Sequence, residues 1–302
     1  MNKNVIAPVV AALLFAACTK SNSNNNTNPP PNPPAGGTLI KTFTLVAYNP
    51  SSGVKLDSSV NNYSYDTKNR LVAVVVNDYD FSSSPSGQLT TDSASETYTS
   101  STISDIRQRW KAGVKQQTVS TTYYLNTAGK LADSAHQSTV SYPGPVTTDN
   151  VSKNSFDANG FLTKQDIYLL QAGNRNLATE ITCTNAGGNT NAVVITTYLI
   201  PGNLASGLQT ATAFTFSSQT SGSAMLASTG NDLNLIIGIA GNGINIMHSN
   251  ANLVQSVTVA VNGSVVETEN LSYVSDSQNR FTAISYKLST GILVSKAYYT
   301  YQ

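Results

Sequence analysis

Cysteine, histidine and charge are all scarce in this chain of 302 residues. Its two cysteines, Cys18 and Cys183, cannot build a disulfide framework, so the stability of any folded domain depends on a packed core. Its two histidines, His136 and His248, lie in different segments and have no companions at metal-ligand spacing. A zinc site or a histidine-based catalytic site is therefore improbable, and we expect no cofactor.

Charged residues make up 11% of the chain, and the formal net charge is +1. Because nucleic-acid-binding proteins carry a basic surplus, this balance argues against a nucleic-acid partner. The sequence also contains no Gly-Xaa-Ser-Xaa-Gly nucleophile elbow and no phosphate-binding glycine loop. What it has instead is abundant Ser, Thr, Asn and Tyr, a composition typical of exported β-rich surface proteins.

Residues 1–17 are expected to be a lipoprotein signal peptide. Lys3 supplies the positive end, residues 5–15 form the apolar core, and Ala16-Ala17 are small residues directly before Cys18. This arrangement resembles the bacterial lipobox, in which the cysteine becomes the lipid-modified first residue of the mature protein. The alternative is an ordinary secretory signal, and the apolar run is shorter than the ~20 residues that a membrane-spanning helix requires.

Residues 18–37 form a segment rich in Asn, Ser and Pro, without a large apolar side chain. Such a segment buries too little surface to offset the entropy lost on ordering, so we expect a disordered tether. Its Pro-rich half would extend at about 3.1 Å per residue and hold the following domain away from the membrane. A Pro-rich recognition ligand is the alternative. Residues 38–302 then form a single β-rich domain.

The phrase at residues 63–71, Tyr-Ser-Tyr-Asp-Thr-Lys-Asn-Arg-Leu, recurs along this domain. It predicts strand, tight turn and strand, because β-branched and aromatic residues flank a polar break that Asp or Asn opens. The turn openers are Asp66, Asn126, Asp157 and Asp276, and their uneven spacing does not fit a solenoid of fixed period. We expect a mainly β fold, a large antiparallel meander of hairpins in a curved or wrapped sheet.

Further strands are predicted by alternation at 38–48, 95–125, 130–142, 161–170, 177–184, 193–200, 253–261, 265–273, 280–288 and 293–301. Pro201-Gly202 is expected to end the middle run, and Asn262-Gly263 is the strongest hairpin signal. Residues 221–252 concentrate large apolar side chains without alternation. Asp232 would cap a short helix near 225–240 that packs on one side of the sheet, and a membrane-inserting segment is the alternative.

One strand carries the candidate binding residues. Alternation around residues 106–115 places Arg107, Arg109, Lys111 and Lys115 on one face and Trp110 on the other. This basic stripe would contact an anionic sugar or a phosphate. The alternative is a solvated outer face that discourages edge-to-edge pairing. The candidate binding residues are Arg107, Arg109, Trp110 and Lys111.

Other polar residues give weaker hypotheses. Paired carboxylates would serve a glycosidase, although nothing in the sequence brings together two of the candidates Asp78, Asp80, Glu96, Glu180, Glu267 and Glu269. Residues 157–160 resemble half of a calcium loop, but the following Phe161-Leu162 offers no ligand and a simple turn explains them. Cys183 is expected to be a small buried hydrophobe. The tyrosines suit cross-strand packing or sugar stacking.

The phrases at residues 63–71, 156–162 and 276–281 resemble the tyrosine-aspartate repeats of Rhs-type β-shell proteins. Together with the lipobox and the tether, they resemble a lipoprotein family of Bacteroidetes-type bacteria that carries the domain of unknown function DUF4595. That resemblance implies a β-sheet lipoprotein without assigned catalysis. We expect a non-enzymatic binding or scaffold module, lipid-anchored to the outer membrane on its periplasmic or cell-surface side. Its partner would be an envelope glycan or protein, and the alternatives are a carbohydrate-binding module or a glycan-processing enzyme.

Overall fold

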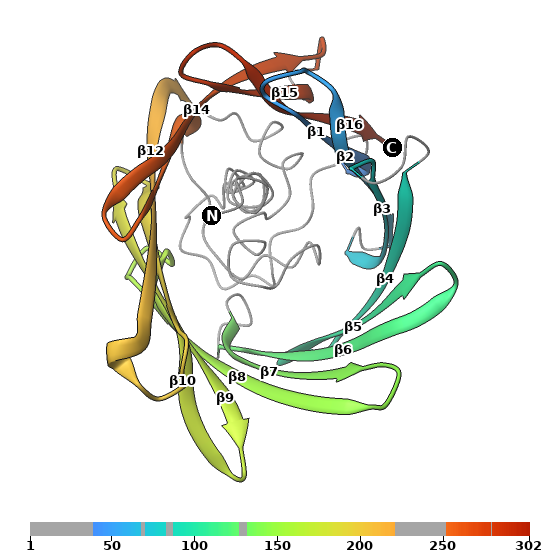
Figure 1. Cartoon of the computed structure of the whole chain (residues 1–302), viewed down its shortest axis with the longest axis vertical. Coiled ribbons are helices and arrows are strands. Elements are labelled where there is room, and N and C mark those ends of the chain that lie inside the picture. The colour runs from blue at the N-terminus through green and yellow to red at the C-terminus, as the bar shows by residue number, and fades with distance from the viewer. Residues whose placement is uncertain (1–38, 68–69, 83–86, 127–131, 221–251, 279) are drawn as a thin grey trace.

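The structure is a computed structural model that describes residues 39–67, 70–82, 87–126, 132–220, 252–278 and 280–302. These residues form 16 antiparallel strands, each paired with its neighbours in sequence, and β1 pairs with β16. The sheet therefore closes into the barrel seen end-on in Figure 1. Because every strand is paired on both sides, the barrel leaves no edge strand.

The first eight strands are β1 (Ile40–Tyr48), β2 (Lys55–Tyr65), β3 (Leu71–Asp80), β4 (Gln88–Tyr98), β5 (Thr102–Lys111), β6 (Val114–Leu125), β7 (Ala132–Ser141) and β8 (Val146–Phe156). The other eight are β9 (Leu162–Gln171), β10 (Asn174–Ala186), β11 (Asn189–Tyr198), β12 (Gly207–Thr220), β13 (Asn252–Val261), β14 (Ser264–Ser275), β15 (Phe281–Leu288) and β16 (Leu293–Tyr301). A short 3-10 turn, η2 (Leu204–Ser206), precedes β12. In the described ranges, no helix has the length and apolar character needed to cross a membrane.

The expected antiparallel meander of hairpins is confirmed. In addition, its first and last strands pair with each other, so the sheet is closed. The expectation that Pro201-Gly202 ends the middle run was wrong, because the sheet resumes at Gly207 and β12 pairs with both β11 and β13. Strand β8 was also not expected from the sequence. The helix predicted near residues 225–240 lies outside the described residues.

The turns lie at two ends of the barrel, because consecutive strands run in opposite directions. The turns that begin at residues 66, 126, 157 and 276 all lead from an even-numbered to an odd-numbered strand, so they share one end, here called the Asp rim. The opposite end, the Gly rim, includes Ala112-Gly113, Ala172-Gly173 and Asn262-Gly263, in which both residues have positive φ. Two such residues match the twist of a two-residue hairpin, so the Asn262-Gly263 turn is confirmed.

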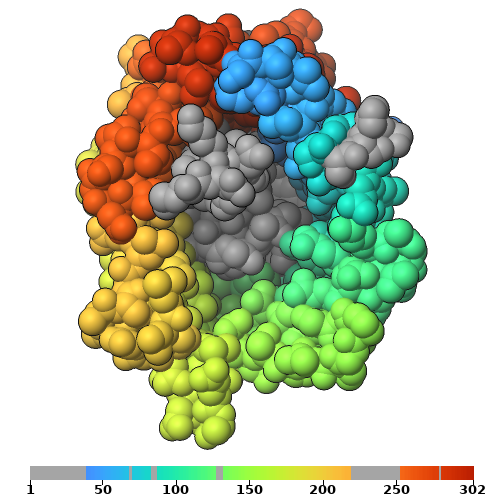
Figure 2. All heavy atoms as spheres, viewed as in Figure 1, coloured from blue at the N-terminus to red at the C-terminus, as the bar shows by residue number. Residues whose placement is uncertain are grey.

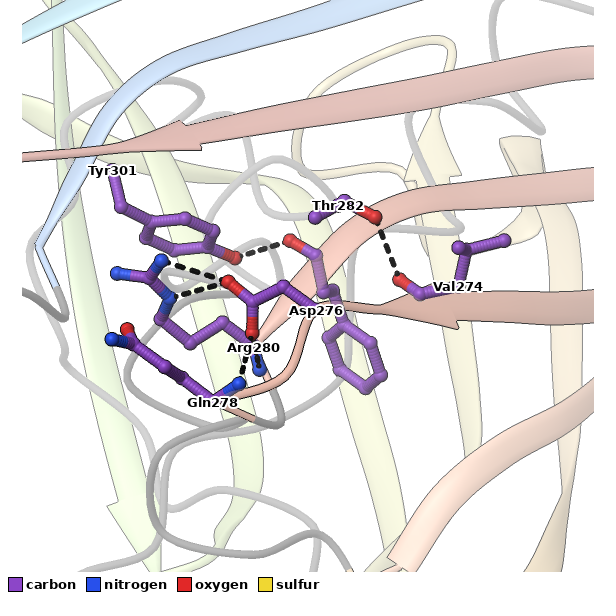
Figure 3. A network of polar contacts seen from close by, with 7 residues as sticks. Val274, Asp276, Gln278, Arg280, Thr282 and Tyr301 are labelled. Carbon is purple, nitrogen blue, oxygen red and sulfur yellow. Dashed lines mark hydrogen bonds and ion pairs between the residues drawn. The ribbon is translucent and has the colours of Figure 1, made fainter.

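Asp276 closes its turn at the Asp rim through its own side chain (Figure 3). Its carboxylate accepts the backbone N–H groups of Gln278 at 2.9 Å and Arg280 at 3.0 Å, and pairs with the Arg280 guanidinium at 2.7 Å. Arg280 lies over the ring of Tyr301, whose hydroxyl donates to the carbonyl of Phe281. The tyrosine of β16 thus ties the start of β15 to the turn.

The same unit is built at Asp66. Its carboxylate accepts the backbone N–H of Arg70 at 2.9 Å and pairs with the Arg70 guanidinium at 2.7 Å. Arg70 lies over the ring of Tyr98, whose hydroxyl donates to the Leu71 carbonyl at 2.7 Å. Asp157 likewise accepts two backbone N–H groups of its turn. The interpretation of these aspartates as turn formers is therefore confirmed.

Register divides the strand side chains into an inward and an outward face. Residues paired directly across antiparallel strands share a face, and successive residues alternate. Tyr123, Ile181 and Val257 are each 1% exposed, which marks theirs as the inward face. The strand pairs, followed from these residues around the barrel, show which side chains face inward on all 16 strands. The atoms of the sheet form a continuous ring in Figure 2.

The inward face has two halves of different chemistry. Strands β9 to β16 and β1 contribute what we call the apolar wall, which includes Ile181, Val193, Phe214, Val257, Ile284, Ala297 and Phe43. Strands β2 to β8 contribute what we call the polar wall, which includes Asp57, Asn61, Asp78, Asp92, Glu96, Asp105, Arg107, Gln117, Thr121, Gln137, Asn150 and Asn154. Charge and amide groups therefore gather on one side of the barrel interior.

The outward face is dominated by hydroxyl side chains, including Thr42, Thr44, Ser93, Thr118, Ser120, Thr122, Ser138, Thr182, Thr196, Thr215, Ser256, Thr258, Thr268 and Ser285. It also carries ions within the strands. Lys164 lies 3.2 Å from Asp166 and 2.8 Å from Glu180, and Glu180 is at the centre of β10. The barrel is therefore polar outside and, over one half, apolar inside.

Candidate functional site

A pocket of about 160 Å³ lies in the polar wall between β4 and β7. It is lined by Asp92, Asp105, Arg107, Arg109, Gln117, Val119, Thr121 and Gln137. All of these side chains belong to the inward face by register. Among the described residues, the lining thus combines two acids, two guanidinium groups, two carboxamides and one hydroxyl.

Strand pairing arranges this part of the wall in rows that cross from β4 to β7. In that order, the rows are Glu96, Asp105, Thr121 and Gln137 nearer the Asp rim, then Ala94, Arg107, Val119 and Thr139, then Asp92, Arg109, Gln117 and Ser141 nearer the Gly rim. The middle row carries a single charged group between two mainly polar rows. The guanidinium of Arg107 therefore lies between the acids of the two neighbouring rows.

Asp92 and Arg109 form a two-point ion pair in the row nearer the Gly rim. The guanidinium donates from Nε to Oδ1 at 2.9 Å and from Nη2 to Oδ2 at 2.7 Å. Hydrogen bonding to Asp92 raises the pKa of Arg109. The Asp92 side chain is 7% exposed and the Arg109 side chain 48% exposed. Water therefore reaches this end of the pocket along Arg109.

Glu96 and Asp105 face each other in the row nearer the Asp rim and are 4% and 2% exposed. Burial and, to a lesser extent, the charge of Asp105 raise the pKa of Glu96 to about 8, although the charge of Arg107 lowers it. Glu96 is therefore mostly protonated at pH 7. Burial likewise raises the pKa of Asp78, while a hydrogen bond from Ser59 lowers it.

The structure separates the candidate binding residues predicted from the sequence. Arg107, Arg109 and Lys111 point inward, and Lys111 lies one row beyond the pocket, opposite Thr90. Trp110 is half-buried on the outward face, so it does not contribute to the same site.

The placement of Lys115 on the face of the arginines was wrong. The Ala112-Gly113 turn reverses the chain, and Lys115 pairs with Trp110, with its Nζ 5.9 Å from the ring centroid. The stripe is also not a guard against edge pairing, since β5 is paired on both sides and Arg107 faces inward.

Sequence reasoning missed the acidic and amide half of this site. Asp92, Asp105, Gln117, Thr121 and Gln137 were not candidates, and they come from four separate strands. A signal does exist in the complementary patterns Asp-Xaa-Ala-Xaa-Glu at 92–96 and Asp-Xaa-Arg-Xaa-Arg at 105–109. Only the register of β4 against β5 brings these patterns together.

A second pair of acids lies on the apolar wall. Glu269 of β14 is 3% exposed, and burial together with the neighbouring Glu267 raises its pKa to about 8. Among the described residues, no group of three or more His, Cys, Asp or Glu side chains is arranged to hold a metal ion. Cys183 packs against the core from a half-buried position, and burial raises the pKa of its thiol to about 12. Cys18 lies outside the described residues.

Comparison with known proteins identifies the fold. No family model and no curated protein match the chain. A porin-like protein from Bacteroides uniformis is 14% identical with a TM-score of 0.57, over 87% of this chain and 98% of the other. A porin-like protein from Bacteroides vulgatus is 11% identical with a TM-score of 0.54, over the same shares. At these identities the likeness shows a shared barrel fold.

Proposed function

We propose that this chain is a non-enzymatic envelope lipoprotein, anchored to the outer membrane through Cys18, whose barrel stands in water and acts as a binding module. The face pattern of the strands carries this proposal. Barrels that span a membrane present an apolar band about 25 Å tall to the lipid and keep their polar side chains inside. Here Ser, Thr and ion pairs face outward, while the largest apolar cluster faces inward.

The outward ions make insertion of this barrel costly. Lys or Arg on the lipid face of a membrane barrel costs about 2–4 kcal/mol at the bilayer midplane. Lys153 and Lys164 face outward from β8 and β9, and Glu180 faces outward from the centre of β10. His136 and Asp149 add a further outward pair, with 3.8 Å between His Nε2 and Asp Oδ1. We therefore place the barrel outside the hydrocarbon core.

The barrel fold shared with two Bacteroides porin-like proteins supports an envelope protein of the kind that the DUF4595 resemblance implies. The lipobox before Cys18 and the polar segment 18–37 support attachment by a flexible tether. Such a tether is compatible with either side of the outer membrane. The interior, with its pocket in the polar wall, is where we place the binding role.

Fractionation of the full chain and its Cys18→Ser variant in a Gram-negative host tests this proposal. The wild-type chain should sediment with the outer membrane, and the variant should appear in the soluble fraction because its barrel has no affinity for lipid. An alkaline carbonate wash separates adsorbed from inserted protein. A variant that stays in the washed outer membrane would contradict the proposal, because the barrel itself would then be inserted. Retention in the inner membrane would mean instead that residues 1–17 were not removed.

Liposome conductance tests independently whether the barrel is inserted in the bilayer. The purified full-length chain should anchor to liposomes without producing ion conductance. Stable channel openings would mean that the 16 strands span the bilayer despite their outward hydroxyl and charged groups.

A glycan-processing enzyme is the second candidate, because two carboxylates, Asp92 and Asp105, line one pocket and Asp105 faces Glu96. Glycosidases use two carboxyl groups about 5–10 Å apart, one of them with a raised pKa. Against this role, Asp92 is held in a two-point pair with Arg109. The test is hydrolysis of chromogenic nitrophenyl glycosides. We expect none, whereas turnover that Asp105→Asn abolishes would favour the enzyme.

A further inference from the structure

The pocket in the polar wall is small and polar, with three buried side chains in its lining and Arg109 at its exposed end. Its volume of about 160 Å³ is room for about five water molecules at ~30 Å³ each. Pockets for drug-sized ligands are larger, at about 300–1,000 Å³. Asp92, Asp105 and Thr121 are 5%, 2% and 5% exposed. Because the lining is polar, the cavity suits water or a small polar ligand.

The charge around the pocket disfavours the anionic ligand that the basic stripe suggested. Among the described residues, the inward face of β2 to β5 carries six acids against three bases: Asp57, Asp78, Asp80, Asp92, Glu96 and Asp105 against Arg107, Arg109 and Lys111. One of the bases, Arg109, is already paired with Asp92. Because Glu96 is mostly protonated at pH 7, the other five acids remain against the three bases. The resulting negative charge repels an entering anion, and it does not repel a neutral or cationic molecule.

The hydrogen-bonding groups of the lining limit the choice of ligand further. Guanidinium and carboxamide nitrogens donate, carboxylate and carboxamide oxygens accept, and the Thr121 hydroxyl does both. A metal ion would face two guanidinium groups and a phosphate would face two carboxylates, so neither suits the whole lining. A hydroxyl group donates and accepts, and a ring that carries several can satisfy both kinds of group at once.

We infer that the pocket binds one small hydroxyl-rich ring without an acidic group, that is, a neutral monosaccharide or an amino sugar. This inference rests on the binding role proposed above. Among the described residues, no aromatic side chain lines the pocket, and Trp110 lies on the other face of the sheet. Recognition is therefore by hydrogen bonds rather than by stacking on a ring, and the affinity for a single sugar is weak.

Saturation-transfer difference NMR detects such weak binding and requires only the intact protein. The full-length chain is kept in a zwitterionic detergent without a sugar headgroup. The probes are glucose, glucosamine and glucuronate, which share one ring and differ in charge. Glucose and glucosamine should bind, with glucuronate weaker by on the order of fivefold.

Matched variants locate the binding. Gln137→Leu removes an inward carboxamide from the pocket and should weaken glucosamine binding by about 2- to 10-fold. Gln108→Leu removes an outward carboxamide on β5 and should leave binding unchanged. If Gln137→Leu fails to fold, Thr121→Val removes a pocket hydroxyl at nearly constant volume and should weaken binding in the same way.

Three results would overturn the inference: no transfer to glucose or glucosamine, strongest binding of glucuronate, or equal losses in Gln137→Leu and Gln108→Leu. The fractionation of the Cys18→Ser variant reads out independently of sugar binding. A chain that fractionates as proposed but binds no sugar therefore refutes this ligand alone. A chain that inserts into membranes refutes the proposed location instead.

Discussion

The free energy of unfolding should fall as pH rises, and replacement of Glu96 by Gln should make this fall smaller. Glu96 is 4% exposed on the inward face and lies opposite Asp105. Burial and the charge of Asp105 together raise its pKa from 4.5 to about 8, against the opposing charge of Arg107. The folded chain thus holds a proton on Glu96 over a pH range in which the unfolded chain has lost it.

The sign and the size of the effect follow from proton linkage. Between pH 4.5 and about 8 the folded state binds the extra proton, so the free energy of unfolding falls as pH rises, by at most about 1.4 kcal/mol per pH unit. Over the whole interval one such group lowers stability by up to about 5 kcal/mol. Glu269, whose pKa is also raised to about 8, adds a similar slope. Glu96→Gln cannot ionise, so roughly half of the combined slope should disappear.

Urea denaturation of the full-length chain, monitored by circular dichroism at pH values from 4 to 9, measures how the free energy of unfolding changes with pH. Glu96→Gln should match the wild type near pH 4 and exceed its stability by a few kcal/mol at pH 9, below the ~5 kcal/mol limit. The matched control is Glu180→Gln, which removes an outward surface ion pair with Lys164 and should cost less than ~1 kcal/mol at every pH. Parallel curves for Glu96→Gln and the wild type would refute the reasoning.

Two further predictions concern the rims. Ala112 has positive φ in the same kind of turn as Asn262, so Ala112→Asn should raise the free energy of unfolding by about 1 kcal/mol and Asn262→Ala should lower it by a similar amount. Urea midpoints measure both changes, and a loss of stability in Ala112→Asn would contradict the turn assignment. Tyr301→Phe removes the hydroxyl that donates to the Phe281 carbonyl but keeps the ring under Arg280, and should cost about 1 kcal/mol. Tyr124→Phe, at a residue 45% exposed, is its control and should change stability by less than ~0.5 kcal/mol; equal losses in the two variants would count against the hydroxyl contact.

The hairpins could be predicted because their turns are local. Asp66 and Asp276 form hydrogen bonds with backbone groups no more than four residues away, so the sequence of each turn specifies its own geometry. Closure depends instead on β1 meeting β16, where the hydroxyls of Thr42 and Thr300 are 2.5 Å apart across 258 residues of chain. No local pattern carries that information.

The missed strand β8 has a physical explanation. Its inward residues include Thr148, Asn150, Ser152 and Asn154, which belong to the polar wall. Its outward neighbours are largely polar as well, so the alternation that signals a half-buried strand is absent. The pocket escaped prediction for a related reason, since only the register of β5 against β4 and β6 places Asp105 and Arg107 beside the other pocket residues.

Register connects the turns to the proposed function. A shift of one residue in the pairing of a strand would turn the inward side chains of that strand outward, because the side-chain period of a strand is two. Such shifts in β1, β10 and β13 would turn Phe43, Ile181 and Val257 outward, and the barrel would then resemble one built for lipid. The turns at the Asp rim and the two-residue turns at the Gly rim stabilise the observed register, in which these side chains face inward. The repeated hairpin phrase thus does more than connect strands, because its geometry keeps Ser and Thr on the outside and so sets the environment in which the barrel is stable.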